Sequence, residues 1–161
     1  MATTSEYKKP LPTPSHVSRP FWDAAKEHRL TYQRCSACGT RVFYPRDVCP
    51  GPECFGVGTL EWAESSGKGW VYASSISYQP AHPAFADDVP YVLAIIELDE
   101  GVRMHTNVIG IDPKEVAIGM RVEVAWDDVT PEISLPKFRP IQVIAAEVMS
   151  WGEVEPAPRL P

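Results

Sequence analysis

The chain of 161 residues has no long apolar run and no cysteine outside one short stretch. Its longest apolar run, YVLAII at 91–96, has the length of a strand and falls far short of the roughly 18 residues that a membrane span needs. The first residues, MATTSEYKKPLPTPSH, are polar and rich in proline, which is unlike a secretory signal. We therefore expect a cytoplasmic protein.

Positive charge is scarce in the second half of the chain. Residues 63–161 carry seven Lys/Arg against fifteen Asp/Glu, a net charge of −8, whereas residues 1–62 carry eight against six, a net charge of +2. An acidic body repels the phosphates of nucleic acid, so this charge balance argues against a nucleic-acid-binding role. The 17 prolines are about double the usual share and disfavour long helices over most of the chain.

All cysteines lie in the stretch CSACGTRVFYPRDVCPGPEC, residues 35–54, with the spacing C-x2-C-x10-C-x4-C. Two short-spaced pairs separated by a strand-length segment are typical of tetrahedral zinc coordination by four thiolates. The β-rich run TRVFYP between the pairs predicts the first hairpin of a zinc ribbon. Four protein ligands leave no open coordination position, so the metal is expected to be structural and to stabilise a small module. The predicted ligands are Cys35, Cys38, Cys49 and Cys54.

Two alternatives to a zinc site remain at this point. A pair of disulfides would use the same four cysteines, but a reducing cytosol disfavours disulfides. Iron in a rubredoxin-like site takes the same ligands, and the spacing does not separate iron from zinc.

A helix is predicted over residues 18–30, after an extended arm at 1–17. Pro20 suits a first helical turn, and Phe21, Ala24, Ala25 and His28 fall on one stripe. We interpret His28 as a packed or partly exposed histidine, because four cysteines already saturate the metal site.

About five strands and a short helical element are expected between residues 63 and 141, which is the inventory of an OB-fold. The predicted fold class is mainly β, with the N-terminal helix, a zinc ribbon at 31–62, an OB-fold barrel at 63–145 and a second arm at 146–161. That last arm is either disordered or docks on a partner.

Three local predictions concern the barrel. The alternating residues Trp70, Tyr72, Ile76 and Tyr78 are expected to pack in its core rather than to stack on bases. The run at 91–96 reads as a central strand buried on both faces. The segment ISLPKFRPI is expected to close the barrel as an interrupted edge strand, because Pro136 and Pro140 cannot donate to a ladder. His105 falls in mid-strand, and no pattern pairs it with a nucleophile.

Several ordered blocks, from RPFWDAAKEHRLTYQRCSACGT through ESSGKGWVYASSISYQPAHPAF and PYVLAIIELDEGVRMHTNVIG to LPKFRP, resemble one known family. It comprises the zinc-ribbon/OB-fold proteins associated with acyl-CoA metabolism, long classified only as a domain of unknown function. The resemblance covers about residues 18–141. One departure is the second knuckle, CPGPEC, which has four intervening residues where the family usually has two.

The resemblance implies a rubredoxin-like zinc ribbon and an OB barrel that does not bind nucleic acid. It also implies a non-catalytic partner subunit, in a hetero-oligomer, of a thiolase-superfamily enzyme that acts on acyl-CoA thioesters. That enzyme is expected to be a lipid-transfer-protein-like aldolase or a thiolase, with steroid side-chain breakdown among the settings. Other members join hydratase domains. For the partner contact we expect the ribbon and the loop at 80–90, with Phe43, Tyr44 and Phe85 as candidate anchors.

The first alternative function is direct acyl-CoA binding, with Arg41, Arg46 and Lys68 holding the phosphates and the barrel offering an apolar slot. A nucleic-acid-binding OB module is the second alternative, since ribbons and OB-folds both occur in that role.

Overall fold

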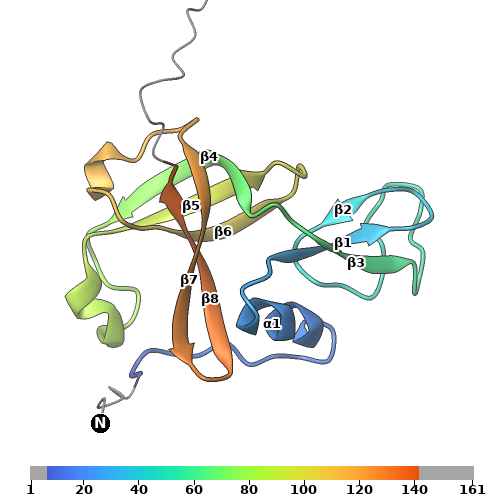
Figure 1. Cartoon of the computed structure of the whole chain (residues 1–161), viewed down its shortest axis with the longest axis horizontal. Helices are drawn as coiled ribbons and strands as arrows, with labels where there is room; N and C mark the ends of the chain where they lie inside the picture. The colour runs from blue at the N-terminus through green and yellow to red at the C-terminus, as the bar shows by residue number, and fades with distance from the viewer. Residues whose placement is uncertain (1–6, 142–161) are drawn as a thin grey trace, which may run out of the picture.

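The computed structural model describes residues 7–141, which form a three-stranded ribbon sheet beside a closed five-stranded barrel, with a helix between them (Figure 1). The sheet has the strand order β2-β1-β3, and the barrel has the order β4-β5-β6-β8-β7. The elements are α1 Arg19–Lys26, β1 Thr31–Cys35, β2 Arg41–Val42, β3 Leu60–Glu64, β4 Lys68–Ser77, the 3-10 helix η1 Pro83–Asp88, β5 Tyr91–Leu98, β6 Arg103–Val108, the 3-10 helix η2 Pro113–Glu115, β7 Arg121–Thr130 and β8 Ile133–Pro140. The mainly β fold with an N-terminal helix, ribbon and OB-fold barrel is confirmed.

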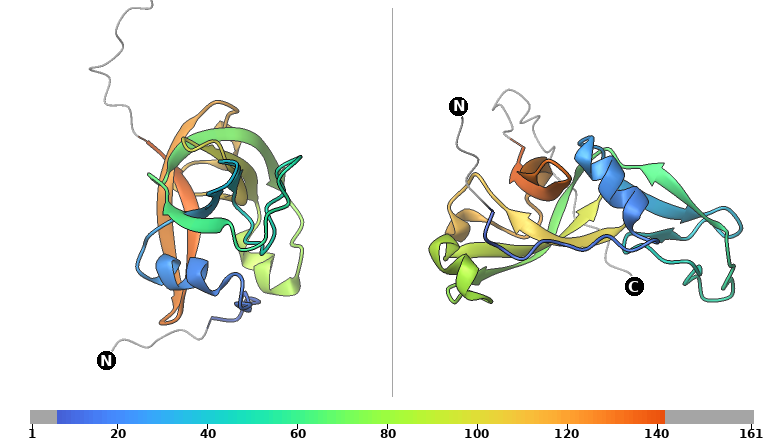
Figure 2. Two further views of the ribbon diagram at one scale, coloured as in Figure 1. Left: turned by 90° about the vertical axis from the view of Figure 1, so that its right-hand side faces the viewer. Right: turned by 90° about the horizontal axis from the view of Figure 1, so that it is seen from below.

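The short helix α1 lies at the junction between the ribbon sheet and the barrel, against β1 and β8 (Figure 2). Phe21, Ala24 and Ala25 are buried, as the spacing predicts. The helix ends at Lys26, and two residues later His28 adopts a left-handed backbone with φ 57°. His28 therefore leaves the stripe and stacks its ring on Trp126 of β7 at 5.5 Å. No helix in the described part of the chain is long and apolar enough to cross a membrane.

One apolar cluster runs through both units. Inward-facing residues of the barrel strands form most of it, and Phe21, Leu30 and Tyr32 extend it into the helix and the ribbon sheet. Separating the ribbon from the barrel would expose these three side chains to water, so the junction is a packed interface. The barrel contributes Val71, Val92, Ala94, Ile96, Leu98, Val102, Met104, Val108, Val122 and Phe138.

The prediction that the strand at 91–96 is buried on both faces is wrong. Along β5, Val92, Ala94 and Ile96 are buried, whereas Leu93 between them is 51% exposed. A strand of a closed barrel turns one face to the core and the other to the outside, so alternate residues are exposed even where all of them are apolar.

The last strand, β8, takes part in the closed barrel as predicted, but it lies between β6 and β7, so the predicted edge position is wrong. It pairs with β7 along its length, but a single residue pair, Val108 with Phe138, joins it to β6 among the described residues. The carbonyl of Pro136 accepts a hydrogen bond from Thr106 Oγ1 at 2.8 Å and so faces β6. Because N–H and C=O of one strand residue point to the same side, Pro136 offers β6 no backbone donor, which agrees with the confinement of the β6–β8 ladder to one pair.

The turn between β5 and β6 ties three segments together through Glu100. Its carboxylate accepts hydrogen bonds from Ser65 Oγ and from the backbone N–H of Ser66, both at 2.7 Å. Its carbonyl accepts a hydrogen bond from the Arg41 guanidinium at 2.5 Å. Burial alone would raise the pKa of Glu100, but the hydrogen bonds from Ser66 and Ser65 outweigh it and lower that pKa.

We predict that Glu100→Gln lowers the free energy of unfolding by about 1–2 kcal/mol at neutral pH, because the charge-assisted acceptor is lost. The folded-state pKa lies below the ordinary 4.5, so the ionised carboxylate stabilises the fold above that pH. This contribution disappears as the pH falls through the folded-state pKa, and the two proteins should converge in acid. Urea denaturation at neutral pH and at a pH below the folded-state pKa measures the difference in the free energy of unfolding between the two proteins. Glu132→Gln, at an exposed turn, is the matched control. A deficit of equal size at acid pH would contradict the role of the charge.

Candidate metal centre

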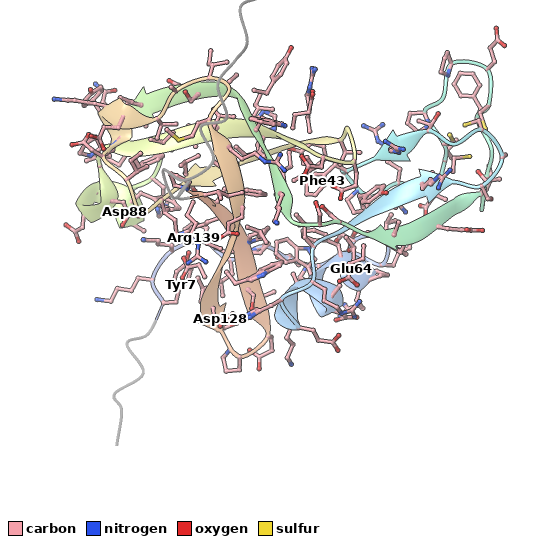
Figure 3. The ribbon with its side chains drawn as sticks, turned by 45° about the horizontal axis from the view of Figure 1, so that its top comes forward. Tyr7, Phe43, Glu64, Asp88, Asp128 and Arg139 are labelled. Atoms are coloured by element: carbon pink, nitrogen blue, oxygen red, sulfur yellow. The ribbon has the colours of Figure 1, made fainter. Side chains whose placement is uncertain are left out.

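The four cysteine sulfurs converge at the end of the ribbon sheet that lies away from the barrel (Figure 3). All four Sγ atoms lie within 4.8 Å of one another. Cys35 and Cys54 have their sulfurs 3.7 Å apart, and those of Cys38 and Cys49 are 3.6 Å apart. Zinc–sulfur bonds of 2.3 Å in a tetrahedron separate neighbouring sulfurs by about 3.8 Å. The cysteines are free, and these separations far exceed the ~2.05 Å of a disulfide, which excludes the disulfide alternative.

Each cysteine pair sits in its own turn. Cys35 ends β1, and the turn to β2 brings back Cys38, with the amide of Gly39 donating to the Cys35 carbonyl at 2.9 Å. In the second knuckle the amide of Cys54 donates to the carbonyl of Gly51 at 3.0 Å, and Val48 pairs with Val57 in an isolated bridge. The wider x4 turn is thereby closed on itself and still delivers its two sulfurs to the site.

Three residues that the sequence reasoning missed line the sulfurs. Thr59 Oγ1 lies 3.2 Å from Cys35 Sγ, and Thr40 Oγ1 lies 3.1 Å from Cys38 Sγ. The amide of Gly51 donates to Cys49 Sγ at 3.4 Å. A hydroxyl-bearing residue two positions after a cysteine, as at Thr40, could have signalled such a contact, whereas Thr59 is brought in by the start of β3.

The protonation of the thiols shows why this cluster needs a cation. The Thr59 hydroxyl lowers the pKa of the Cys35 thiol to about 6. For Cys54 the backbone N–H of Gly56 lowers the pKa, but the Cys38 thiol, burial and the Cys35 thiol together raise it to about 12. Four thiolates this close repel one another, and a divalent cation removes the repulsion and deprotonates all of them. The donor set therefore fits a four-thiolate metal ion.

The predicted anchor residues have different surroundings. Phe43, labelled in Figure 3, is partly buried and packs edge-on against Phe21, with ring centroids 5.7 Å apart. Tyr44 is 48% exposed, and its hydroxyl lies 2.6 Å from Nδ1 of His105. Phe85 lies in η1, where Lys9 of the N-terminal arm sits 5.6 Å from its ring centroid.

The three predicted phosphate-binding residues are not gathered at one hydrogen-bonded site. Arg41 bonds to the carbonyl of Glu100, and the carbonyl of Lys68 accepts the amide of Asp99 in the same turn. Arg46 lies apart from them, with its backbone N–H donating to Gln33 Oε1 at 2.8 Å. A role of these residues in CoA binding remains a prediction.

The aromatic residues of β4 lie outside the barrel, so the expectation that they pack in the core is wrong. Trp70 and Tyr72 are 48% and 47% exposed, and Tyr78 beyond the strand is 63% exposed. The Arg121 guanidinium carbon lies 4.6 Å from the Trp70 ring centroid, and that of Arg103 lies 3.6 Å from the Tyr72 ring centroid. Val71 faces the core instead, because alternate residues of a strand point to opposite faces.

Two family models match adjacent parts of the chain. One is described as the ChsH2 rubredoxin-like zinc ribbon domain and matches residues 22–61. The other is described as the ChsH2 C-terminal OB-fold domain and matches residues 62–127. A DUF35 domain-containing scaffold protein of Methanothermobacter thermautotrophicus is 37% identical over 107 residues, which cover 66% of this chain and 78% of that protein. The chain belongs to the DUF35 family.

Two hydratase subunits also match. A probable enoyl-CoA hydratase alpha subunit of Thermomonospora curvata is 46% identical over 74% of this chain, and the match covers 36% of that protein. The 3-oxo-4,17-pregnadiene-20-carboxyl-CoA hydratase alpha subunit of Mycobacterium tuberculosis is 35% identical over 80% of this chain and 39% of that protein. The chain thus spans between a third and two fifths of these two relatives.

Among solved structures, the Ltp2-ChsH2(DUF35) aldolase matches with a TM-score of 0.70 and 40% identity, over 81% of this chain and 98% of that chain. The DUF35 relationship and the four converging sulfurs together make the metal centre a structural zinc site of the rubredoxin-like type.

We predict that Gly51→Ala lowers zinc affinity at least tenfold. A Cβ atom at Gly51 would lie 2.8 Å from Thr40 Oγ1, 3.1 Å from Cys38 Sγ and 3.2 Å from the Cβ of Cys54, so the second knuckle would have to move. Competition with a chromophoric chelator measures the affinity. Pro52→Ala in the same turn is the control and should bind zinc as the parent does. Unchanged affinity for Gly51→Ala would show that the close approach does not shape the site.

Proposed function

We propose that this DUF35 protein is a non-catalytic, zinc-stabilised partner subunit of a thiolase-superfamily enzyme that acts on acyl-CoA thioesters. The observation that carries the proposal is the match to the Ltp2-ChsH2(DUF35) aldolase, which spans 98% of the matched chain. The scaffold name of the archaeal relative and the CoA thioesters in the names of the two hydratase subunits support the same role. The pregnadiene-carboxyl-CoA relative supports a steroid acyl group as one candidate substrate of the complex.

The chemistry of the metal site supports a structural role. Four thiolates saturate a tetrahedral ion, which leaves no position for water or substrate. The ion would therefore hold the ribbon in shape while another chain supplies the reacting groups.

The cluster of Ser134, Asp128 and His28 also supports a non-catalytic role. Asp128 Oδ1 accepts hydrogen bonds from Ser134 Oγ at 2.5 Å and from His28 Nε2 at 2.8 Å. A nucleophilic triad needs the histidine between the serine and the carboxylate, so that the imidazole takes the hydroxyl proton. Here the carboxylate stands in the middle, and the arrangement fastens the end of α1 to the β7–β8 hairpin instead.

We place the enzyme contact on the ribbon, where large apolar side chains are exposed around the second knuckle. Phe55 is 66% exposed, Val57 is 76% exposed and Val48 is 43% exposed. Apolar side chains gathered on a small, metal-fixed module are suited to bury against a partner without an ordering cost. They extend the predicted contact surface beyond Tyr44.

The test is coexpression with the thiolase-superfamily proteins of the same genome, followed by size-exclusion chromatography at micromolar concentration. Co-elution in a fixed ratio is expected, with thioester cleavage in the complex and none by this chain alone. Separate elution from every such enzyme, or thioester turnover by the isolated chain, would overturn the proposal.

For the contact surface, we predict that Phe55→Ser and Val57→Ser each weaken the complex about tenfold or more, because an apolar contact is lost. Ile118→Ser is the matched control, since Ile118 is 73% exposed but lies between η2 and β7 of the barrel and not in the ribbon. Affinities come from biolayer interferometry against the immobilised enzyme. A loss confined to Ile118→Ser would move the contact to the barrel.

A further inference from the structure

Large apolar side chains face water on the outside of strands β4 and β5. Trp70 and Tyr72 of β4 are 48% and 47% exposed, and Leu93 of β5 is 51% exposed. The partly buried Ile95 points to the same side as Leu93, two residues away, and its register partner is Ala73, next to Tyr72. We call Trp70, Tyr72, Leu93 and Ile95 the outer apolar face. Adjoining exposed apolar side chains of this kind mark a surface for contact.

The outer apolar face is elongated and hollowed at one end. Leu93 is the register partner of Ser75, which follows Trp70 along β4, so the face extends about 17 Å along the strands. An open hollow of about 270 Å³ lies beside Leu93 and Ile95. A stretch of chain with apolar side chains can lie along such a face and place one of them in the hollow.

The charges on this side of the barrel are already paired. The guanidinium groups that stack on the two aromatic rings belong to Arg103 and Arg121. Glu97 pairs with Arg103 at 2.6 Å, and Asp99 pairs with Arg121. An occupant of the face therefore gains little from bearing charge, and a nearly uncharged apolar segment suits it best.

The described part of the chain ends beside one end of the outer apolar face. The amide of Ile141 donates to the carbonyl of Arg121 at 3.0 Å, and Arg121 is the register partner of Trp70. Strands β8 and β4 both run antiparallel to β7, so β8 points in the direction in which β4 runs from Trp70 to Ser75. The strand that precedes residues 142–161 is thus aimed along the face.

The sequence after Ile141 has the composition that the face requires. Seven of the ten residues in QVIAAEVMSW, 142–151, are apolar, and Glu147 is the one charged residue among them. Ten extended residues span about 33 Å, which exceeds the length of the face. Because the segment follows β8 directly, its effective concentration at the face is about millimolar, so even a weak contact would be occupied.

We propose that residues 142–151 dock on the outer apolar face of their own barrel. Ile144 would lie against Trp70 and Tyr72, and Val148 would reach Leu93 and the hollow beside it. This occupant would shield the face from water and from a second copy of the chain. The contact belongs to this chain alone and does not depend on the proposed enzyme partner.

The experiment records NOEs in the isolated full-length chain. NOEs from the methyl groups of Ile144 and Val148 to the Trp70 indole ring and the Leu93 methyl groups are the expected result. The absence of NOEs between residues 142–151 and this face would overturn the proposal.

A matched pair of variants tests the segment in the full-length chain. The double variant Ile144→Glu/Val148→Glu should lose these NOEs and shift the Trp70 indole and Leu93 methyl signals, because two charges do not pack on an apolar face. Val154→Glu, which lies beyond the docking stretch, should keep the NOEs and the signal positions of the parent chain. Identical Trp70 and Leu93 signals in the parent and both variants would contradict the docking.

Two other occupants give different results. In a mixture of isotope-labelled and unlabelled chains, NOEs found only between different molecules would assign the face to a second copy and overturn the proposal. Trp70 and Leu93 signals that move only when the thiolase-superfamily enzyme is added, with no NOE to residues 142–151, would assign it to that enzyme and overturn the proposal as well.

Discussion

The structure depends on the convergence of four sulfurs at one point. A sheet of three short strands, one of them two residues long, has too few inward-facing side chains to fold by burial. The backbone N–H of Gly56 lowers the pKa of the Cys54 thiol, but the neighbouring thiols and burial raise it to about 12, as expected where four thiolates would repel one another. A divalent cation neutralises this repulsion, and its bonds to the four sulfurs order both knuckles. The ordered ribbon in turn fixes the position of Tyr44 beside the barrel.

The outer face of the barrel has its own electrostatic pattern. The guanidinium groups that stack on Trp70 and Tyr72 are also paired with carboxylates: Arg121 with Asp99, and Arg103 with Glu97 at 2.6 Å. Such a surface offers aromatic area without excess positive charge. Single-stranded nucleic acid favours aromatic platforms in a basic groove, so the arrangement agrees with the acidic composition in arguing against that ligand.

Spacing and composition were enough to predict the ribbon, the helix stripe and the strand count. They succeeded because metal geometry and side-chain periodicity act locally. The errors arose where pairing between strands that are far apart in the sequence decides which residues are buried. Which face of β4 lies inward depends on register with β5, and a bulge at Tyr72 shifts that register. That β8 has a neighbour on both sides depends on its parallel contact with β6 at Val108 and Phe138, which no local pattern encodes. Thr59 reaches the sulfur of Cys35 from a position 24 residues further along the chain. The C-terminal arm predicted at 146–161 lies outside the described residues.

Phe21, Leu30 and Tyr32 belong to the same apolar cluster as the barrel interior. By mass action, a ligand that binds only the folded form stabilises everything that folds with it. Zinc bound by the ribbon should therefore raise the melting temperature of the barrel as well, and the increase should grow with the free zinc concentration. The stability of the barrel would thus depend on metal binding by the ribbon, because these three side chains pack against both units.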